Sequence, residues 1–98
     1  MPRGRTVRAE LEAALRASPA TAHQLSRSVR VPEKEVASHL SHLARSLQAH
    51  GERLEVAPAA CLGCGFEFKG RERLEKPGRC PRCRGTRIEP PVFSISSA

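Results

Sequence analysis

The 98-residue sequence has no long hydrophobic run, because no apolar stretch approaches the roughly 20 residues that a membrane-spanning helix requires. Its first residues, Met1 to Arg5, are basic but lack the apolar centre of a secretion signal. Glu10 and Glu12 argue against an organelle transit peptide. We therefore expect a cytoplasmic protein in a reducing compartment.

The sequence also lacks the side-chain groupings on which most enzymes depend. It contains no nucleophile beside an evident general base, no paired carboxylates in a plausible cleft, and no glycine-rich loop for phosphates. We predict that the protein is not an enzyme.

Large apolar residues are scarce in the segment from Cys61 to Glu89. They are Leu62, Phe66, Phe68, Leu74 and Ile88. A segment shorter than about 40 residues with so small a core usually folds only with a metal or with disulfides. We therefore expect a bound metal to stabilise this half of the chain.

Two C-x2-C pairs lie in this segment, with fifteen residues between them. They are Cys61-Leu-Gly-Cys64 and Cys80-Pro-Arg-Cys83. Each pair can form a tight turn, here called a knuckle, that places its two sulfurs on one side. Two facing knuckles then supply the four sulfur ligands of a tetrahedral metal site. Gly65 and Gly85 can take the positive φ that such turns need. The spacing predicts one structural Zn²⁺ held by Cys61, Cys64, Cys80 and Cys83, with no open coordination position.

Other uses of the four cysteines fit the sequence less well. Two disulfides would suit a secreted chain, and a redox C-x-x-C motif usually accompanies a βαβ pattern that is absent here. The two knuckles resemble those of rubredoxin, in which the same four sulfurs hold one iron. The loop between them is short for a rubredoxin, so zinc is preferred and iron is the alternative.

The N-terminal half has the spacing of three helices. Apolar residues from Val7 to Leu15 predict a first helix that begins after Thr6 and ends at Ser18-Pro19. Thr21 and Gln24 form a capping-box pattern that opens a second helix. A third helix is predicted over about Pro32 to Gln48, with a buried stripe of Val36, Leu40, Leu43 and Leu47.

Two runs of alternating polarity flank the cysteine segment and predict strands at Arg53–Ala57 and Val92–Ile95. Their apolar members, Leu54, Val56, Phe93 and Ile95, are expected to close the helical core. The predicted fold class is α+β: a winged helix-turn-helix of three helices and a small β-hairpin, with a zinc ribbon inserted in the wing. The expected parts are a flexible basic arm (1–5), the winged-helix domain with the first wing strand (6–57), the ribbon (58–90), and the returning strand and tail (91–98).

The segment from Leu25 to Leu40 resembles the second and third helices of winged-helix transcription regulators of bacteria and archaea. Arg30 stands where those proteins usually have a turn glycine. From Thr6 to Ile95, the chain is similar to predicted transcriptional regulators in which a winged helix-turn-helix is fused to a rubredoxin-like zinc ribbon. This resemblance implies a regulator that binds double-stranded DNA, and a homodimer would suit paired half-sites.

Charge agrees with an anionic partner, because the formal net charge is +7 and stays positive after four thiolates bind Zn²⁺. If the third helix enters a major groove, its candidate DNA contacts are Lys34, Ser38, Ser41, His42 and Arg45. The same residues could form an ordinary solvated helix face. Glu33 and Glu35, which repel phosphates, instead suit an adaptor that docks through the ribbon on the transcription or ribonucleoprotein machinery. A one-iron electron carrier is a third alternative.

The ribbon is rich in cations. They are Lys69, Arg71, Arg73, Lys76, Arg79, Arg82, Arg84 and Arg87. One interpretation is a surface that follows a phosphate backbone. The other is local compensation, because a zinc tetrathiolate carries a charge of −2 that nearby arginines would offset. The sequence leaves both open.

Overall fold

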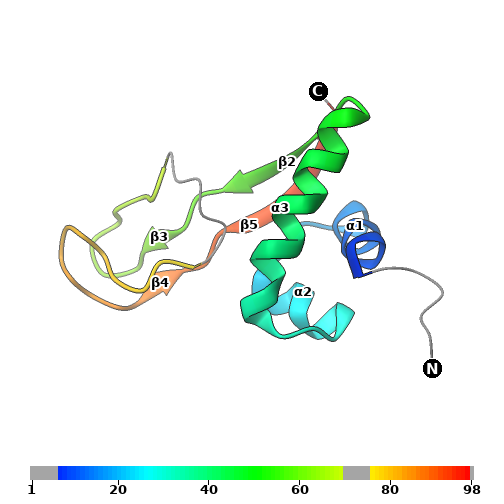
Figure 1. The fold of residues 1–98 in the computed structure, drawn as a ribbon. Coiled ribbons are helices and arrows are strands. Elements are labelled where there is room, and N and C mark those ends of the chain that lie inside the picture. The colour runs from blue at the N-terminus through cyan, green and yellow to red at the C-terminus, as the bar shows by residue number, and fades with distance from the viewer. Residues whose placement is uncertain (1–6, 70–75, 98) are drawn as a thin grey trace.

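Three helices and two small antiparallel sheets form the described part of the chain, residues 7–69 and 76–97 of a computed structural model (Figure 1). The helices are α1 (Val7–Ala17), α2 (Ala22–Val29) and α3 (Glu33–Ala49). The predicted basic arm, the expected cap Thr6, and Leu74 lie outside the described residues.

Helix α2 begins at the predicted capping box. The side-chain oxygen of Thr21 accepts a hydrogen bond from the Gln24 backbone N–H at 3.2 Å, and Gln24 Oε1 accepts one from the Thr21 N–H at 2.8 Å. Both donors would otherwise lack partners at a helix start. The capping-box prediction is confirmed.

A short turn joins α2 to α3 through Arg30. This residue adopts the left-handed conformation, with φ 62° and ψ 50°, and its N–H donates to the Ser26 carbonyl at 2.9 Å. The arginine thus takes the conformation for which glycine is usually chosen. Pro32 has an extended ψ of 137° and is the N-cap, so α3 starts one residue later than predicted.

One three-stranded sheet packs with the helices. Its strands are β1 (Ala20–Thr21), β2 (Glu52–Ala57) and β5 (Val92–Ser97), in the order β1-β5-β2. Both neighbours of β5 are antiparallel to it, with Ala20 and Val56 on either side of Phe93. Strand β1 was not predicted, because two residues are too few to display alternation.

The main core lies between the three helices and this sheet. Its buried members are Leu11, Leu15, Leu25, Val29, Val36, Leu40, Leu43, Leu47 and Phe93. All four residues of the predicted α3 stripe are among them. Leu54 and Ile95 pack against the core as predicted, but the prediction for Val56 is wrong, since its side chain is 40% exposed. Val56 lies near the end of β2 that leads into the ribbon, where residues 55–58 are all exposed, whereas Leu54 on the same strand still reaches the core.

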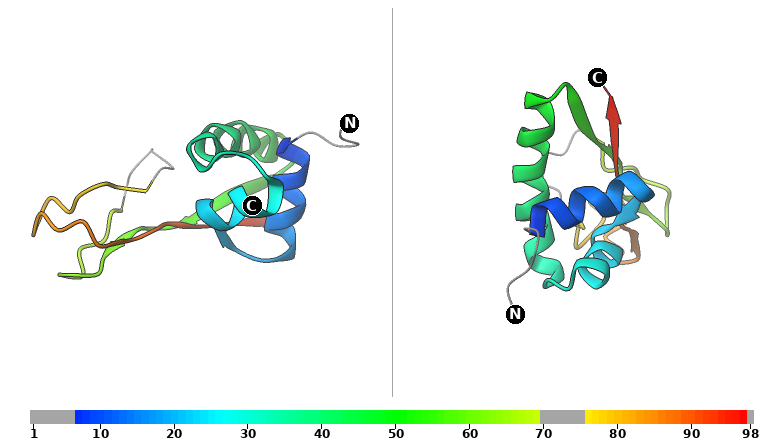
Figure 2. Two further views of the ribbon diagram at one scale, coloured as in Figure 1. Left: turned by 90° about the horizontal axis from the view of Figure 1, so that it is seen from below. Right: turned by 90° about the vertical axis from the view of Figure 1, so that its right-hand side faces the viewer.

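The ribbon, residues 58–90, projects from the end of the β2–β5 hairpin to one side of the helices (Figures 1 and 2). It contains the second sheet, formed by β3 (Ala60–Cys61) and β4 (Ile88–Glu89). This projection gives the molecule principal extents of 45 × 33 × 19 Å. None of the helices in the described part of the chain is long and apolar enough to span a membrane.

Candidate metal centre

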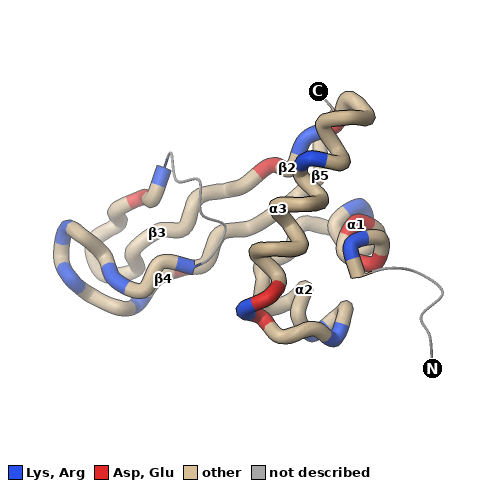
Figure 3. The backbone as a smooth tube through the Cα atoms, in the orientation of Figure 1, with Lys and Arg blue, Asp and Glu red and all other residues tan. Residues whose placement is uncertain are grey.

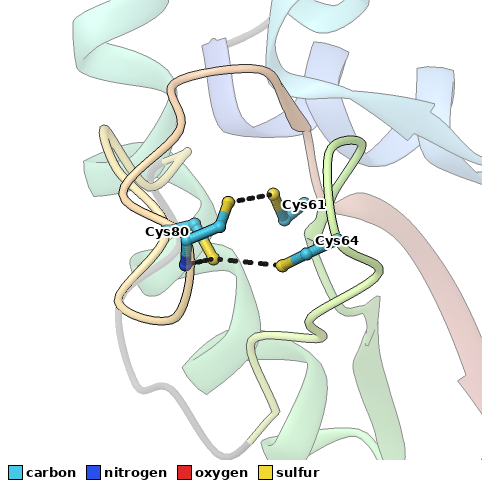
Figure 4. Close-up of side chains that lie close together, drawn as sticks. Cys61, Cys64 and Cys80 are labelled. Atoms are coloured by element: carbon cyan, nitrogen blue, oxygen red, sulfur yellow. Dashed lines mark hydrogen bonds between the residues drawn. The ribbon is translucent and has the colours of Figure 1, made fainter.

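The four cysteine sulfurs meet between the two knuckles of the ribbon. All four Sγ atoms lie within 4.8 Å of one another, and all four cysteines are free. Across the knuckles, Cys61 Sγ is 3.5 Å from Cys83 Sγ, and Cys64 Sγ is 3.6 Å from Cys80 Sγ. Figure 4 shows the side chains of Cys61, Cys64 and Cys80 converging from the two facing loops.

The two knuckles repeat the same backbone hydrogen bonds. The N–H of the first cysteine donates to the carbonyl five residues later, from Cys61 to Phe66 at 2.8 Å and from Cys80 to Gly85 at 2.9 Å. The N–H of Gly65 donates to the Cys61 carbonyl at 2.8 Å, and that of Arg84 donates to the Cys80 carbonyl at 2.8 Å. The two halves of the site are therefore built alike.

The left-handed residue differs between the knuckles. Gly65 has φ 80°, as predicted, but the second such residue is Arg84, with φ 62°, and not Gly85. Gly85 serves a different need, because a Cβ there would lie 3.3 Å from Cys83 Sγ. The Gly85 N–H also donates to that sulfur at 3.4 Å.

Backbone N–H groups point at the sulfurs and favour their thiolate form. Cys80 Sγ accepts from the N–H groups of Arg82 at 3.3 Å and Cys83 at 3.5 Å. Burial disfavours ionisation of Cys80, but these two donors lower the pKa of its thiol to about 7. At Cys61, burial is likewise outweighed by the N–H groups of Cys64 and Gly63, and the pKa is lowered.

Crowding of the sulfurs acts in the opposite direction on Cys64. The Phe66 N–H favours its thiolate, but partial desolvation of the sulfur and the three neighbouring cysteine sulfurs raise the pKa of Cys64 to about 11. Four thiolates so close together repel one another, so a cation is needed for all of them to be ionised together. A tetrahedral Zn²⁺ with Zn–S bonds of about 2.3 Å places its sulfurs about 3.8 Å apart. The donor set and its spacing fit this ion, which would be closed on all four sides by protein.

A very small core surrounds the site. Ala59, Cys61, Cys80 and Ile88 are its buried members, and Phe66 and Phe68 pack against it with their rings edge to face at 5.0 Å. Cys64 and Cys83 are exposed. So little apolar surface supports the expectation that this part of the chain depends on a metal.

Comparison with known families matches both halves of the chain. Residues 6–54 match the family described as PF0610-like, N-terminal, and residues 58–98 match the PF0610 rubredoxin-like zinc beta-ribbon domain. The chain belongs to the PF0610-like family. Its structure is similar to the solution NMR structure of protein PF0610 from Pyrococcus furiosus, with a TM-score of 0.81 and 26% sequence identity. That similarity covers 100% of this chain and 95% of that chain. Comparison with curated proteins finds no match.

Membership of the PF0610-like family agrees with the zinc-ribbon prediction and with a metal at the four cysteines. The candidate DNA contacts lie apart from the cysteines, on α3. Its members Lys34, Ser38, Ser41, His42 and Arg45 are all exposed. They lie opposite the buried stripe, and the half-buried His39 flanks that stripe.

Sequence analysis did not find a groove between the helices and the ribbon. It is open, has a volume of about 390 Å³, and is lined by Ala22, Glu33, Lys34, Ala37, Lys76, Pro90 and Pro91. Residues far apart in the sequence form its walls, so no local pattern could have indicated it. The groove connects the first turn of α3 to the base of the ribbon.

Proposed function

We propose that the chain is a DNA-binding transcription regulator: a winged helix whose wing carries a zinc ribbon, acting in the reducing cytoplasm and without enzymatic activity. The observation that carries this proposal is the exposed face of α3. That face projects from a helix pair joined by a three-residue turn, Arg30 to Pro32, which is the geometry of a helix-turn-helix unit.

The order of the sheet supports a winged helix. Strand β1 lies between α1 and α2 in the chain and pairs with β5, while β2 and β5 pair as a hairpin after α3. This hairpin corresponds to the wing. Such a scaffold holds α3 firmly, because α3 packs its buried stripe against the other helices and the sheet.

The charged side chains of α3 differ in whether they have a partner within the protein. Glu33, one of the two acids at the start of α3, lies 3.0 Å from His23 on α2 and is therefore engaged within the protein. Lys34 and Arg45 have no ion-pair partner among the described residues. They can neutralise phosphates while Ser38, Ser41 and His42 face base edges.

The metal has a structural role in this proposal. With four thiolates occupying its coordination positions, zinc has no place for water or substrate, so it acts by holding the two knuckles together. Protein purified under reducing conditions is expected to be colourless, with one zinc per chain. A red protein containing iron would instead favour the one-iron electron carrier.

The decisive experiment measures fluorescence anisotropy of the zinc-loaded protein with mixed genomic duplexes at two salt concentrations. We expect binding that weakens steeply with salt. The Lys34→Gln/Arg45→Gln variant should bind duplex DNA more weakly than wild type at each salt concentration. Arg53→Gln, at a residue 3.8 Å from Glu55 on β2, should change the affinity little. No binding at low salt would reject the proposal.

A protein-interaction adaptor is the second candidate. One observation favours it. Among the described residues, two large apolar side chains are exposed, and Leu62 in the first knuckle is the more exposed of them, at 62%. Nuclease-treated lysate separates the two functions. A protein retained on the wild-type chain but lost on Leu62→Ser would favour the adaptor, if DNA binding is also absent.

A further inference from the structure

The ribbon carries four arginines whose charges are not used within the described part of the protein. Arg79, Arg82, Arg84 and Arg87 are all exposed. Their guanidinium groups make no hydrogen bond or ion pair to residues 7–69 or 76–97, and the ribbon ion pair found there joins Lys69 to Glu67 at 3.1 Å. Arg71 and Arg73, also counted among the ribbon cations, lie outside the described residues.

These arginines do not contact the sulfurs of the metal centre with their side chains. The sulfurs accept hydrogen bonds from backbone N–H groups, including the N–H of Arg82 to Cys80 Sγ at 3.3 Å and that of Gly85 to Cys83 Sγ. Local compensation through direct arginine–sulfur hydrogen bonds is therefore not how the described ribbon is built. No residue in the described part of the ribbon occupies the guanidinium groups, which leaves them open to an external anion on that side.

The ribbon arginines and the basic residues of α3 lie on different parts of the molecule, with a groove between them. Figure 3 shows basic residues gathered along the outer loop of the ribbon, well away from the helices. Between the ribbon and α3 lies the groove described above, with Lys34 on one side and Lys76 on the other. Basic side chains thus occur on α3, at the groove, and on the ribbon.

The dimensions suit a long polyanion. The molecule extends 45 Å along its longest axis, more than the roughly 34 Å of one B-DNA turn. Duplex DNA carries a negative charge for about every 1.7 Å of its axis, so a ribbon beside α3 would meet phosphates in any sequence. Among residues 7–69 and 76–97, these exposed arginines have no side-chain partner to lose when they bind such a backbone.

We infer that the arginine-rich edge of the ribbon, Arg79, Arg82, Arg84 and Arg87, is a second DNA-binding surface that contacts the phosphate backbone of the duplex read by α3. This inference rests on the proposed function. The ribbon then adds affinity without sequence preference, while α3 supplies the preference.

The test is the slope of log K against log salt concentration for wild type and Arg82→Gln/Arg87→Gln. Each lost phosphate contact lowers the magnitude of the slope by about 0.9, so we expect a decrease of about 1.8. The loss in affinity should be similar for all duplex sequences. Zinc content equal to that of wild type shows that the ribbon of the variant is still assembled.

The matched control is Arg53→Gln/Lys69→Gln, which removes the same charge from residues that have carboxylates within 3.8 Å and 3.1 Å. Its slope should stay close to that of wild type. Equal decreases in both variants would show a general charge effect and overturn the inference, as would a slope unchanged in the ribbon variant. In either case DNA binding by wild type leaves the proposed function standing. Absence of wild-type binding would reject both.

Discussion

Arg84, which follows Cys83, adopts the same left-handed backbone conformation as Gly65, which follows Cys64. Their φ angles are 62° and 80°, and their N–H groups donate to the first cysteine of each knuckle at the same distance, 2.8 Å. A side chain makes this conformation costly, by about 1–2 kcal/mol for an ordinary L-residue. The second knuckle therefore carries a strain that the first avoids.

Replacing that arginine is predicted to stabilise the ribbon. Arg84→Gly removes the backbone strain but increases the freedom of the unfolded chain, so the expected net gain is up to about 1 kcal/mol. Competition with a chromogenic chelator would report it as tighter zinc binding. Gly65→Ala should act in the opposite direction through the backbone alone, because nothing lies within 4 Å of the added Cβ. Weaker zinc binding by Arg84→Gly would contradict the strain argument.

Removal of the metal is predicted to unfold the ribbon and spare the helices. The ribbon core of Ala59, Cys61, Cys80 and Ile88 is separate from the main core, which contains no cysteine. A chelator should therefore collapse the amide NMR signals of the two knuckles, while those of α1, α2 and α3 remain dispersed. Restored signals after one equivalent of zinc would complete the test. Loss of all dispersed signals would show that the two cores are coupled.

Leu40 is predicted to be essential for the main core. It is fully buried, so Leu40→Ala should lower the free energy of unfolding by about 2–5 kcal/mol. Urea denaturation followed by helical circular dichroism measures this change. Leu62→Ala removes the same atoms from a side chain that is 62% exposed and should change the stability of the helices by less than about 0.5 kcal/mol. Similar losses in both variants would contradict the burial argument.

The ion pair between Arg16 and Glu52 is predicted to make stability depend on pH. The two guanidinium nitrogens of Arg16 donate to the two carboxylate oxygens of Glu52, each at 2.8 Å, and this hydrogen bonding lowers the pKa of Glu52. A carboxyl with a depressed folded pKa adds stability above its unfolded pKa, near 4.5, and loses it as pH falls through the folded value.

Glu52→Gln should therefore be less stable than wild type near neutral pH, and the two should converge below about pH 4.5. Thermal melts at a series of pH values would measure the difference in stability between Glu52→Gln and wild type. Taking this difference cancels the pH effects that both proteins share. Arg16→Gln also removes the ion pair with Glu12, so its loss should be at least as large, and adding Glu52→Gln to it should lower the stability little further. A difference that persists unchanged in acid would rule out the ion pair as its source.

Local patterns were sufficient to predict the helices and the cluster of four cysteines. The spacing of Val36, Leu40, Leu43 and Leu47 indicates one helix face, and the Thr21 capping box depends on residues three apart. The two C-x2-C pairs fix the sulfur positions in the same local way, since each knuckle is closed by hydrogen bonds within six residues. These features depend little on the rest of the fold.

Features that depend on distant neighbours could not be predicted. Alternation grouped Val56 with Leu54, but it does not show how far along the strand the core extends. The left-handed conformation at Arg84 is local to the second knuckle, but it was missed because glycine is the usual signal for it and Gly85 stands next to it. The groove near Lys34 and Lys76 forms only where α3 and the base of the ribbon lie side by side, and no local sequence pattern indicates that contact.

The position of β5 has a consequence for the order in which the chain folds during synthesis. Phe93, fully buried in the helical core, lies on the central strand and follows the whole ribbon in the chain. A nascent chain that has only its three helices outside the ribosome lacks this residue and the strand to which β1 and β2 pair. The helical core thus stays incomplete until the ribbon has been translated.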